Sequence, residues 1–392
     1  MFLFAKKNTE KVFLVCHVGS GYVSAQIVLS DTQTKKPKAV WYSKEKIFNK
    51  DYVGTEISVT GLRRALRKVI VDANTYFHNK AKRPDDVSIT FAAPWYLSEN
   101  HSQVIKNEKP KIFTQVDLVA ILQEAGNSLE KKSKEKKSLV PHLFNDGVQI
   151  IEKILLDVKL NGYDVEDPFG KMAHELYLSY FMSVIPKKIG DYTESLVSEF
   201  FPNSLITLHS FPMTHLSVME KIGKDTKNSI FVDVSDFTTD ISKDAGGEIT
   251  ANAHISIGKQ SFIKAISDAL NVEAYIAESL LSLYVSGNSS ERESADMHFI
   301  LKDIELLWST EIEKAITGMT TNEKINFRYV LSCDSFANEY FKKLLPTEVT
   351  SPSDNSKNNV STIDFYQEMI SYSQGVTADS FLAIESLFCI YF

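Results

Sequence analysis

Two short turns in the 392-residue sequence carry residue types suited to binding phosphate and magnesium. The first is Gly19-Ser20-Gly21, directly after the apolar run 12–18. Backbone N–H groups at a tight turn point toward phosphate oxygens, and glycine lets the backbone approach closely. The second turn lies in 233–240 (DVSDFTTD), where Asp233 is placed to hold the Mg²⁺ that accompanies phosphates. The alternative is that Asp233 and Asp240 only cap the ends of strands.

The hydrophobic pattern places each turn between two strands. Alternating or continuous apolar runs predict strands at 12–18, 22–29, 39–44 and 87–92, and a stripe with helical spacing predicts a helix over 62–77. The first 95 residues therefore have the order β-β-β-α-β. A second strand–turn–strand hairpin is predicted at 229–257, followed by a helix-rich stretch at 260–315 and a short strand at 329–332.

Four segments follow from this pattern. We expect a first lobe at 1–96, an inserted small α+β subdomain at 97–182, a return to the first lobe at 183–228 and a second lobe at 229–392, with a helix-rich outer part at 258–325. Residues 346–362, rich in Ser, Asn, Asp and Pro, are expected to form a surface loop.

Composition excludes several classes of function. The 43 basic and 50 acidic residues give a net charge of −7, which argues against a nucleic-acid partner. Three scattered cysteines provide neither a disulfide framework nor a zinc site and favour a reducing cytoplasm. No apolar run approaches the ~18 residues of a membrane span. The lysine-rich run 131–137 is interpreted as a solvated helix end, with contact to anionic lipid as the alternative.

Taken together, four stretches resemble motifs of the bacterial actin-like ATPase superfamily, in the branch that contains the cell-division protein FtsA and the type IV pilus assembly protein PilM. Segments 17–23 (HVGSGYV) and 233–240 resemble its two phosphate loops, D-[IV]-G-S-x-x-[VIT] and D-x-G-x-G-T-T-D. Further likenesses are Asn161-Gly162-Tyr163 with 167–170 (DPFG), and 255–258 (ISIG). The resemblance implies an actin-like (ribonuclease H-like) two-lobed α/β fold around a nucleotide cleft.

The resemblance also implies a nucleotide site. Carried over position by position, its residues are Gly19, Ser20, Gly21, Asp233, Thr238, Thr239 and Ser332, with Asp233 facing the metal. Three features depart from the family pattern: His17 replaces an Asp, Ser235-Asp236-Phe237 replaces small glycines, and 331–335 (LSCDS) replaces a Gly-Gly turn. A carboxylate at Asp236 repels polyphosphate unless a metal or cation intervenes, and Phe237 adds bulk. Binding of ATP and Mg²⁺ is therefore expected to be weak or lost.

These observations favour a scaffold over an enzyme. We expect a cytoplasmic protein that docks partners of a division or pilus-type machine at the inner membrane face, mainly through the inserted subdomain, with at most peripheral membrane contact and with self-association as an option. The alternative is an active ATPase or a sugar-kinase-like phosphotransferase, which requires intact phosphate turns and a metal site. A third option is a regulatory protein with an unrelated ligand in the cleft.

Two apolar segments remain to be placed. Residues 381–392 are apolar nearly all round, with Glu385 and Ser386 as the polar exceptions, and are predicted to form a core helix that closes the second lobe. Without a basic face this helix is poorly suited to lie on a membrane. Trp95 and Tyr96 are predicted to pack at the junction with the inserted subdomain, with an exposed partner contact as the alternative.

Overall fold

The computed structural model describes residues 10–31, 37–47, 58–135, 141–224, 228–244, 247–319, 327–333, 337–346, 360–362 and 364–392. The end of the lysine run (136–137), residues 334–335 of the last turn and most of the expected loop (347–359) lie outside these ranges.

The first sheet explains why the run 12–18 is apolar without interruption. Val12, Leu14 and Cys16 face one side, in a core shared with α1 and α3, whereas Phe13 and Val15 face the opposite side. A strand covered on both faces needs apolar side chains on both. The sheet order is β15 (Ser371–Tyr372), β3 (Pro37–Lys46), β2 (Tyr22–Asp31), β1 (Glu10–Val18), β4 (Asp86–Phe91), β9 (Leu205–Ser210).

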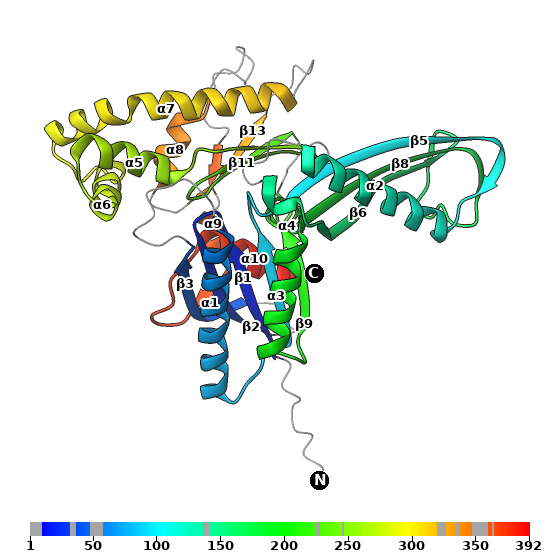
Figure 1. Ribbon diagram of the computed structural model, residues 1–392, viewed down its shortest axis with the longest axis horizontal. Coiled ribbons are helices and arrows are strands. Elements are labelled where there is room, and N and C mark those ends of the chain that lie inside the picture. The colour runs from blue at the N-terminus through cyan, green and yellow to red at the C-terminus, as the bar shows by residue number, and fades with distance from the viewer. Residues whose placement is uncertain are drawn as a thin grey trace, which may run out of the picture.

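Helices cover both faces of this sheet (Figure 1). The helices on one face are α1 (Val59–Lys80) and α3 (Lys187–Phe200), and the opposite face carries α10 (Ser380–Tyr391), which also packs against α4 (Phe211–Lys221). Helix α1 buries the predicted stripe, and the Ser58 side chain caps its N-terminus by accepting a hydrogen bond from the backbone N–H of Gly61.

The second sheet has the order β12 (Ile249–Ile255), β11 (Thr239–Asp244), β10 (Ser229–Val234), β13 (Arg328–Ser332), β14 (Val360–Thr362). The helices on its outer side are α5 (Lys259–Leu270), α6 (Ala274–Val285), α7 (Glu291–Met319) and α8 (Asn338–Leu344). Its inner side meets the first lobe: Phe231 and Val330 share a core with Ala39 of β3, with α4 and α10, and with Tyr366 of α9 (Asp364–Glu368). This cluster, which we call the shared core, joins the two lobes.

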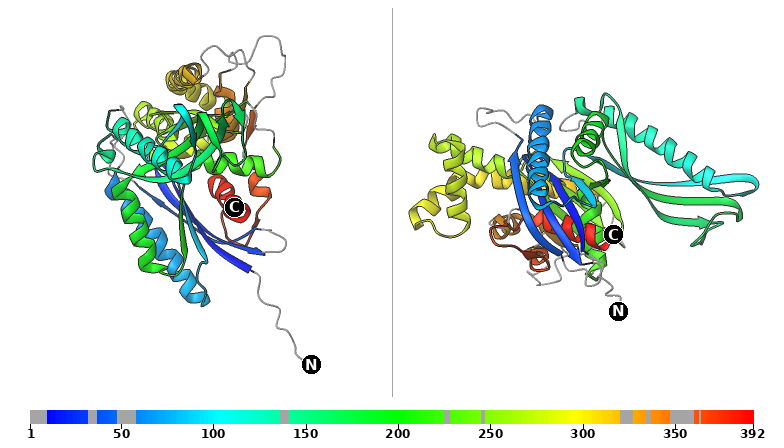
Figure 2. Two further views of the ribbon diagram at one scale, coloured as in Figure 1. Left: turned by 90° about the vertical axis from the view of Figure 1, so that its right-hand side faces the viewer. Right: turned by 90° about the horizontal axis from the view of Figure 1, so that it is seen from below.

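A third sheet forms an arm that projects away from both lobes (Figures 1 and 2). Its order is β5 (Leu97–Ile112), β8 (Met172–Pro186), β6 (Val148–Leu160), β7 (Tyr163–Asp164), all antiparallel. Helix α2 (Gln115–Glu135) lies along one face, and the short 3-10 helix η1 (Pro141–Phe144) follows. We call this unit, which spans 97–186, the inserted arm.

The end of the chain requires a correction. Residues 229–392 were all expected in the second lobe, yet β15 pairs with β3 and α10 packs against β1 and β2 of the first lobe. The physical reason is that the outer-facing Phe13 and Val15 of β1 need a cover, which Leu382 and Ile390 of α10 provide. Helix α10 is a core helix as predicted, but the core it completes is that of the first lobe.

Candidate functional site

The first turn is held rigidly at the end of β1. The backbone N–H of Gly19 donates to the carbonyl of Tyr22 over 3.0 Å, and the carbonyl of Gly21 accepts from Ile47 over 2.9 Å. The buried Trp95 side chain donates from Nε1 to the Gly19 carbonyl over 2.7 Å. Trp95 therefore fixes the turn, and its ring is buried and does not form an exposed partner contact.

The second turn is fixed by the start of α5. The backbone N–H groups of Lys259 and Gln260 donate to the carbonyls of Ser235 and Asp236 over 3.0 Å and 2.8 Å. The first N–H groups of a helix have no partner within the helix and commonly bind anions. Here two of them bind the turn itself. Gly258 is required at this point, because a Cβ there lies 2.5 Å from the Ser235 carbonyl oxygen.

The two turns touch each other directly. The hydroxyls of Ser20 and Ser235 share a short hydrogen bond, and the backbone N–H of Phe237 donates to Ser20 Oγ over 2.8 Å. A Cβ added to Gly21 overlaps the carboxylate of Asp236. N–H and hydroxyl groups of the two predicted phosphate turns are thus bonded to each other between the lobes. We call this contact the turn–turn contact.

The Asp236 carboxylate in the turn–turn contact is neutralised by a cation of the chain itself. Lys259 Nζ lies 3.1 Å from Asp236 Oδ1 and 3.6 Å from Glu278 Oε1. The side chains of Lys259 and Asp236 are only 11% and 7% exposed, so neither charge is well solvated and each requires the other. The cation beside Asp236 is therefore the ammonium group of Lys259.

A row of polar side chains crosses the inner side of the second sheet. Strand register aligns Ser332, Asp233, Asp240 and His254 on β13, β10, β11 and β12. The Asp240 carboxylate accepts a hydrogen bond from the Tyr96 hydroxyl of the first lobe and lies 2.8 Å from His254 Nδ1. Burial, reinforced by the negative charge of Asp240, raises the pKa of Tyr96 well above its usual range. The first lobe covers Asp233, Asp240 and Ser332 of this row, which are buried.

Asp233, the expected metal-facing residue, lies within this row. Its carboxylate is buried, 3.7 Å from Nδ1 of the fully buried His215 on α4. Burial raises the pKa of Asp233, and the nearby His215 and Ser332 oppose the increase only in part. Within the described ranges, no group of three or more His, Cys, Asp or Glu side chains is arranged to hold a metal ion.

The two threonines of the second turn point to opposite sides. Thr238 Oγ1 donates to the Ala93 carbonyl of the first lobe over 3.2 Å. Thr239 Oγ1 donates to the Ile257 carbonyl over 2.7 Å and accepts from Trp308 Nε1 over 3.0 Å, inside the second lobe. The structure therefore brings Gly19–Gly21, Asp233, Thr238 and Ser332 to the lobe interface and turns the Thr239 side chain away from it.

His17, where the family pattern has an Asp, bonds to the C-terminal helix. Its Nδ1 lies 2.6 Å from Glu385 Oε1, and both side chains are fully buried. The ring stacks on Phe381 with a centroid separation of 4.8 Å. Burial raises the pKa of Glu385 well above its usual value, and Asp379 adds to the effect. Position 17 therefore anchors α10 and does not present a carboxylate for a metal.

Sequence reasoning missed three residues of this region. Lys259 had a usable signal, since it directly follows the 255–258 motif at the start of a helix. Glu385 also had one, as a single acid in an apolar helix. His215 had no local signal, because its role depends on the packing of α4 against the second sheet.

ATP with Mg²⁺ does not fit between the turns as they stand. Backbone and side-chain atoms of Ser20, Ser235 and Asp236 occupy the space between them, and Gly21 adjoins a carboxylate. A polyphosphate requires the turns to separate and the Lys259–Asp236 pair to break. No catalytic step is therefore derived through a nucleotide.

No protein-family model and no curated protein matches the chain in sequence. Solved structures match over nearly its full length. The structure of the PilM-PilN type IV pilus biogenesis complex aligns over 97% of this chain and 98% of that chain, at 10% identity and a TM-score of 0.57. The chain has the actin-like ATPase fold. The predicted likeness to PilM in fold is confirmed, whereas the proximity to FtsA stays a prediction.

Two further solved structures match less well. The ethanolamine utilization protein EutJ from Carboxydothermus hydrogenoformans aligns over 90% of this chain and 84% of its own, at 10% identity and a TM-score of 0.39. A Bacteroides thetaiotaomicron protein with actin-like ATPase fold and unknown function aligns over 98% of both chains, at 10% identity and a TM-score of 0.35. At 10% identity, the match to the PilM-PilN structure shows likeness in fold alone and leaves activity open.

Proposed function

We propose that this protein is a PilM-type scaffold in which contact between the lobes has replaced nucleotide binding. The turn–turn contact carries the proposal: Ser20 bonds to Ser235 and Phe237, and Asp236 pairs with Lys259 beside Gly21. Phosphoryl transfer depends on donors and metal ions aimed at the phosphates. Here the equivalent groups bind one another.

The proposed partners are proteins of a membrane-associated machine, with the pilus type favoured over the division type because PilM supplies the full-length structural likeness. The inserted arm is the proposed docking surface, since it projects from the lobes (Figure 1). Elements inserted into a rigid scaffold are common binding sites. Among the described residues, no helix combines the length and apolar character needed to cross a membrane, so the proposed membrane proximity comes from the partner.

The nucleotide part of the proposal is tested by titrating the full chain with ATP and Mg²⁺ in a calorimeter. We expect no measurable binding for the wild type. Asp236→Gly combined with Phe237→Gly is expected to raise affinity at least about tenfold, because it removes a like charge and bulk and releases Lys259 for phosphate. Asp236→Asn, which keeps the bulk, is the control and is expected to gain less. Turnover above roughly 1 s⁻¹ by the wild type instead establishes an ATPase.

The scaffold part is tested by cross-linking in cells. The tagged full chain is expected to co-purify from membranes with a membrane-anchored protein of a pilus or division machine. Recovery from the soluble fraction without any stoichiometric partner contradicts the proposal, whatever the outcome of the nucleotide titration.

A further inference from the structure

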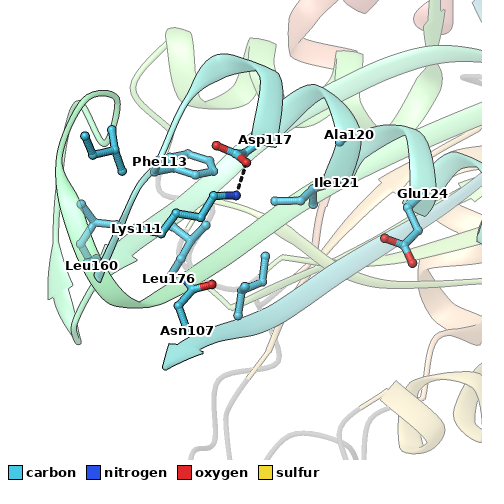
Figure 3. A pocket seen from close by; sticks show the side chains of 12 residues that line it. Asn107, Lys111, Phe113, Asp117, Ala120, Ile121, Glu124, Leu160 and Leu176 are labelled. Atoms are coloured by element: carbon cyan, nitrogen blue, oxygen red, sulfur yellow. Dashed lines mark hydrogen bonds and ion pairs between the residues drawn. The ribbon is translucent and has the colours of Figure 1, made fainter. Parts of the chain in front are cut away.

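The outer half of the inserted arm contains a pocket between α2 and the sheet (Figure 3). Its volume is about 240 Å³, and its walls are mainly apolar: Ile105, Ile112, Phe113, Ile121, Leu160 and Leu176. Small-molecule sites usually measure ~300–1,000 Å³ and contain several converging polar groups. This pocket is smaller and more apolar than such sites, and its size suits one or two inserted side chains.

One end of the pocket is closed by groups that are already satisfied. Lys111 Nζ lies 2.6 Å from Asp117 Oδ1, and Asp117 also accepts hydrogen bonds from the backbone and hydroxyl of Thr114. These donors lower the pKa of Asp117 to about 2, so it stays ionised and paired. Phe113 stacks on Phe169 at 5.6 Å between ring centroids and stiffens the wall. At this end of the pocket the charges of Lys111 and Asp117 are already paired, and the wall formed by Phe113 is held in place.

The other end carries an acid without a partner. Glu124 is exposed on α2, and no hydrogen bond or ion pair to it occurs among the described residues. Figure 3 shows its carboxylate at the opposite end of the pocket from the Lys111–Asp117 pair. The positive charge of Lys111 and the negative charge of Asp117 cancel, so the charge of Glu124 makes the pocket lining negative overall. Positive charge on an occupant is therefore favoured, and an anionic lipid surface is disfavoured.

The rim of the pocket is apolar and exposed. Val116, Met172 and Ile112 are 77%, 61% and 46% exposed, and Ile112 pairs with Met172 across β5 and β8. Clustered exposed apolar side chains next to a polar edge mark protein-binding surfaces. The arm therefore offers a contact area larger than the pocket itself.

The edge of the sheet restricts how an occupant binds. Strand β5 is an edge strand, and its outer half contains Lys106, Lys109, Pro110 and Lys111 together with a register shift between Lys106 and Lys111. Lysines, proline and irregular register are the features that prevent a further strand from adding to an edge. An occupant must therefore insert side chains between α2 and the sheet.

We propose that this pocket binds a short segment of a partner protein in which a bulky apolar side chain stands next to a lysine or arginine. The apolar side chain fills the space above Ile121 and Leu176, and the basic group pairs with Glu124. The inference deepens the proposed scaffold function by giving the arm a specific ligand chemistry, and it rests on the arm being the docking surface.

The test selects random dodecapeptides displayed on phage against the full chain, with subtraction on Ala120→Trp. Ala120 lines the pocket mouth and is exposed, so the bulky ring blocks the pocket without entering the core. We expect a consensus with an apolar residue beside Lys or Arg. Synthetic consensus peptides are expected to lose about tenfold in affinity on Ala120→Trp and about threefold on Glu124→Gln. Gln123→Trp and Gln123→Lys, on the same helix outside the pocket, are the matched controls.

Methyl NMR of the full chain places the bound peptide, because the lining contains Ile105, Ile112, Ile121, Leu160 and Leu176. Failure to enrich any consensus, an acidic consensus, or peptides that bind Ala120→Trp as well as wild type overturns the proposal. These outcomes leave the scaffold function untouched if the full chain still cross-links to its membrane partner. Loss of that cross-link with intact peptide binding instead counts against the scaffold function.

Discussion

At the scale of single residues, ionisable groups are buried where the two lobes meet. Asp233, His215, His17 and Glu385 are each at most 3% exposed. A charged group taken out of water costs several kcal/mol unless a partner neutralises it, and otherwise it gives up its charge. Burial raises the pKa of both Asp233 and Glu385, because it penalises the charged form of each carboxyl. Such residues make the folded protein sensitive to pH.

Asp233 allows this sensitivity to be measured. Burial raises its folded-state pKa above the value of about 3.9 in an unfolded chain, so the folded state binds more protons between those two values. Its stabilisation is complete below about pH 3.9 and is lost as the pH rises toward the raised pKa. Relative to wild type, Asp233→Asn is therefore expected to gain unfolding free energy as the pH rises over this interval, by at most ~1.4 kcal/mol per pH unit.

Urea unfolding at a series of pH values measures this difference. Asp268→Asn is the control, because Asp268 is 64% exposed and pairs with Lys264 at the surface. Its difference from wild type is expected to stay nearly constant. A wild-type advantage over Asp233→Asn that grows with pH would show that His215 holds the Asp233 carboxylate ionised.

At the scale of elements, α10 is the least obvious component of the first lobe. It supplies Leu382 and Ile390 to the face of β1 opposite α1, and Glu385 to His17. Leu382→Ala is expected to lower the unfolding free energy by about 2–5 kcal/mol, because the fully buried side chain leaves a cavity. Leu306→Ala, the same change at a 65% exposed side chain on α7, is expected to stay within about 0.5 kcal/mol.

Chemical denaturation of both leucine variants, followed by circular dichroism, provides the comparison. Equal losses for the two would mean that α10 is peripheral to the core. A loss confined to Leu382→Ala supports the assignment of α10 to the first lobe.

Local sequence patterns predicted most of these elements but not their long-range partners. Both hairpins and the stripe of α1 follow from apolar periodicity and glycine turns, which are local signals. The position of α10 does not follow from local signals, because an apolar helix can cover either lobe. The face of β1 that carries Phe13 and Val15 needs a cover, and this determines where α10 packs. Likewise, the role of Asp236 as an obstacle to phosphate stays a prediction, and its pairing with Lys259 could not be predicted, because it depends on how α5 docks on the turn.

At the scale of the whole molecule, the lobes are joined more firmly than lobes that open and close. The shared core combines apolar side chains of both sheets with α4, α9 and α10. Tyr96 adds a hydrogen bond to Asp240, and Asn252 adds one to Ser98 at the base of the inserted arm. Domains move relative to each other by default unless the interface is large and apolar. Here the interface contains a core of its own.

We therefore expect the two lobes to unfold in a single transition. Tryptophan fluorescence, to which Trp95 of the first lobe and Trp308 of the second lobe contribute, and far-ultraviolet circular dichroism are expected to give coincident urea curves. The radius of gyration from X-ray scattering is expected to be the same with and without ATP and Mg²⁺. Two separated transitions, or compaction on adding ATP, would contradict a permanently closed interface.

The path of the chain has a consequence for synthesis in the cell. The face of β1 that carries Phe13 and Val15 is covered by residues 380–391, which the ribosome adds some 360 residues later. At about 5–20 residues per second, that face stays open for roughly 20–70 s while the arm and the second lobe are made. The first lobe therefore starts to fold early in synthesis but is completed only after α10 has been made. A nascent chain interrupted before α10 has an uncovered apolar sheet face, and transiently exposed hydrophobic surface of this kind is prone to aggregation.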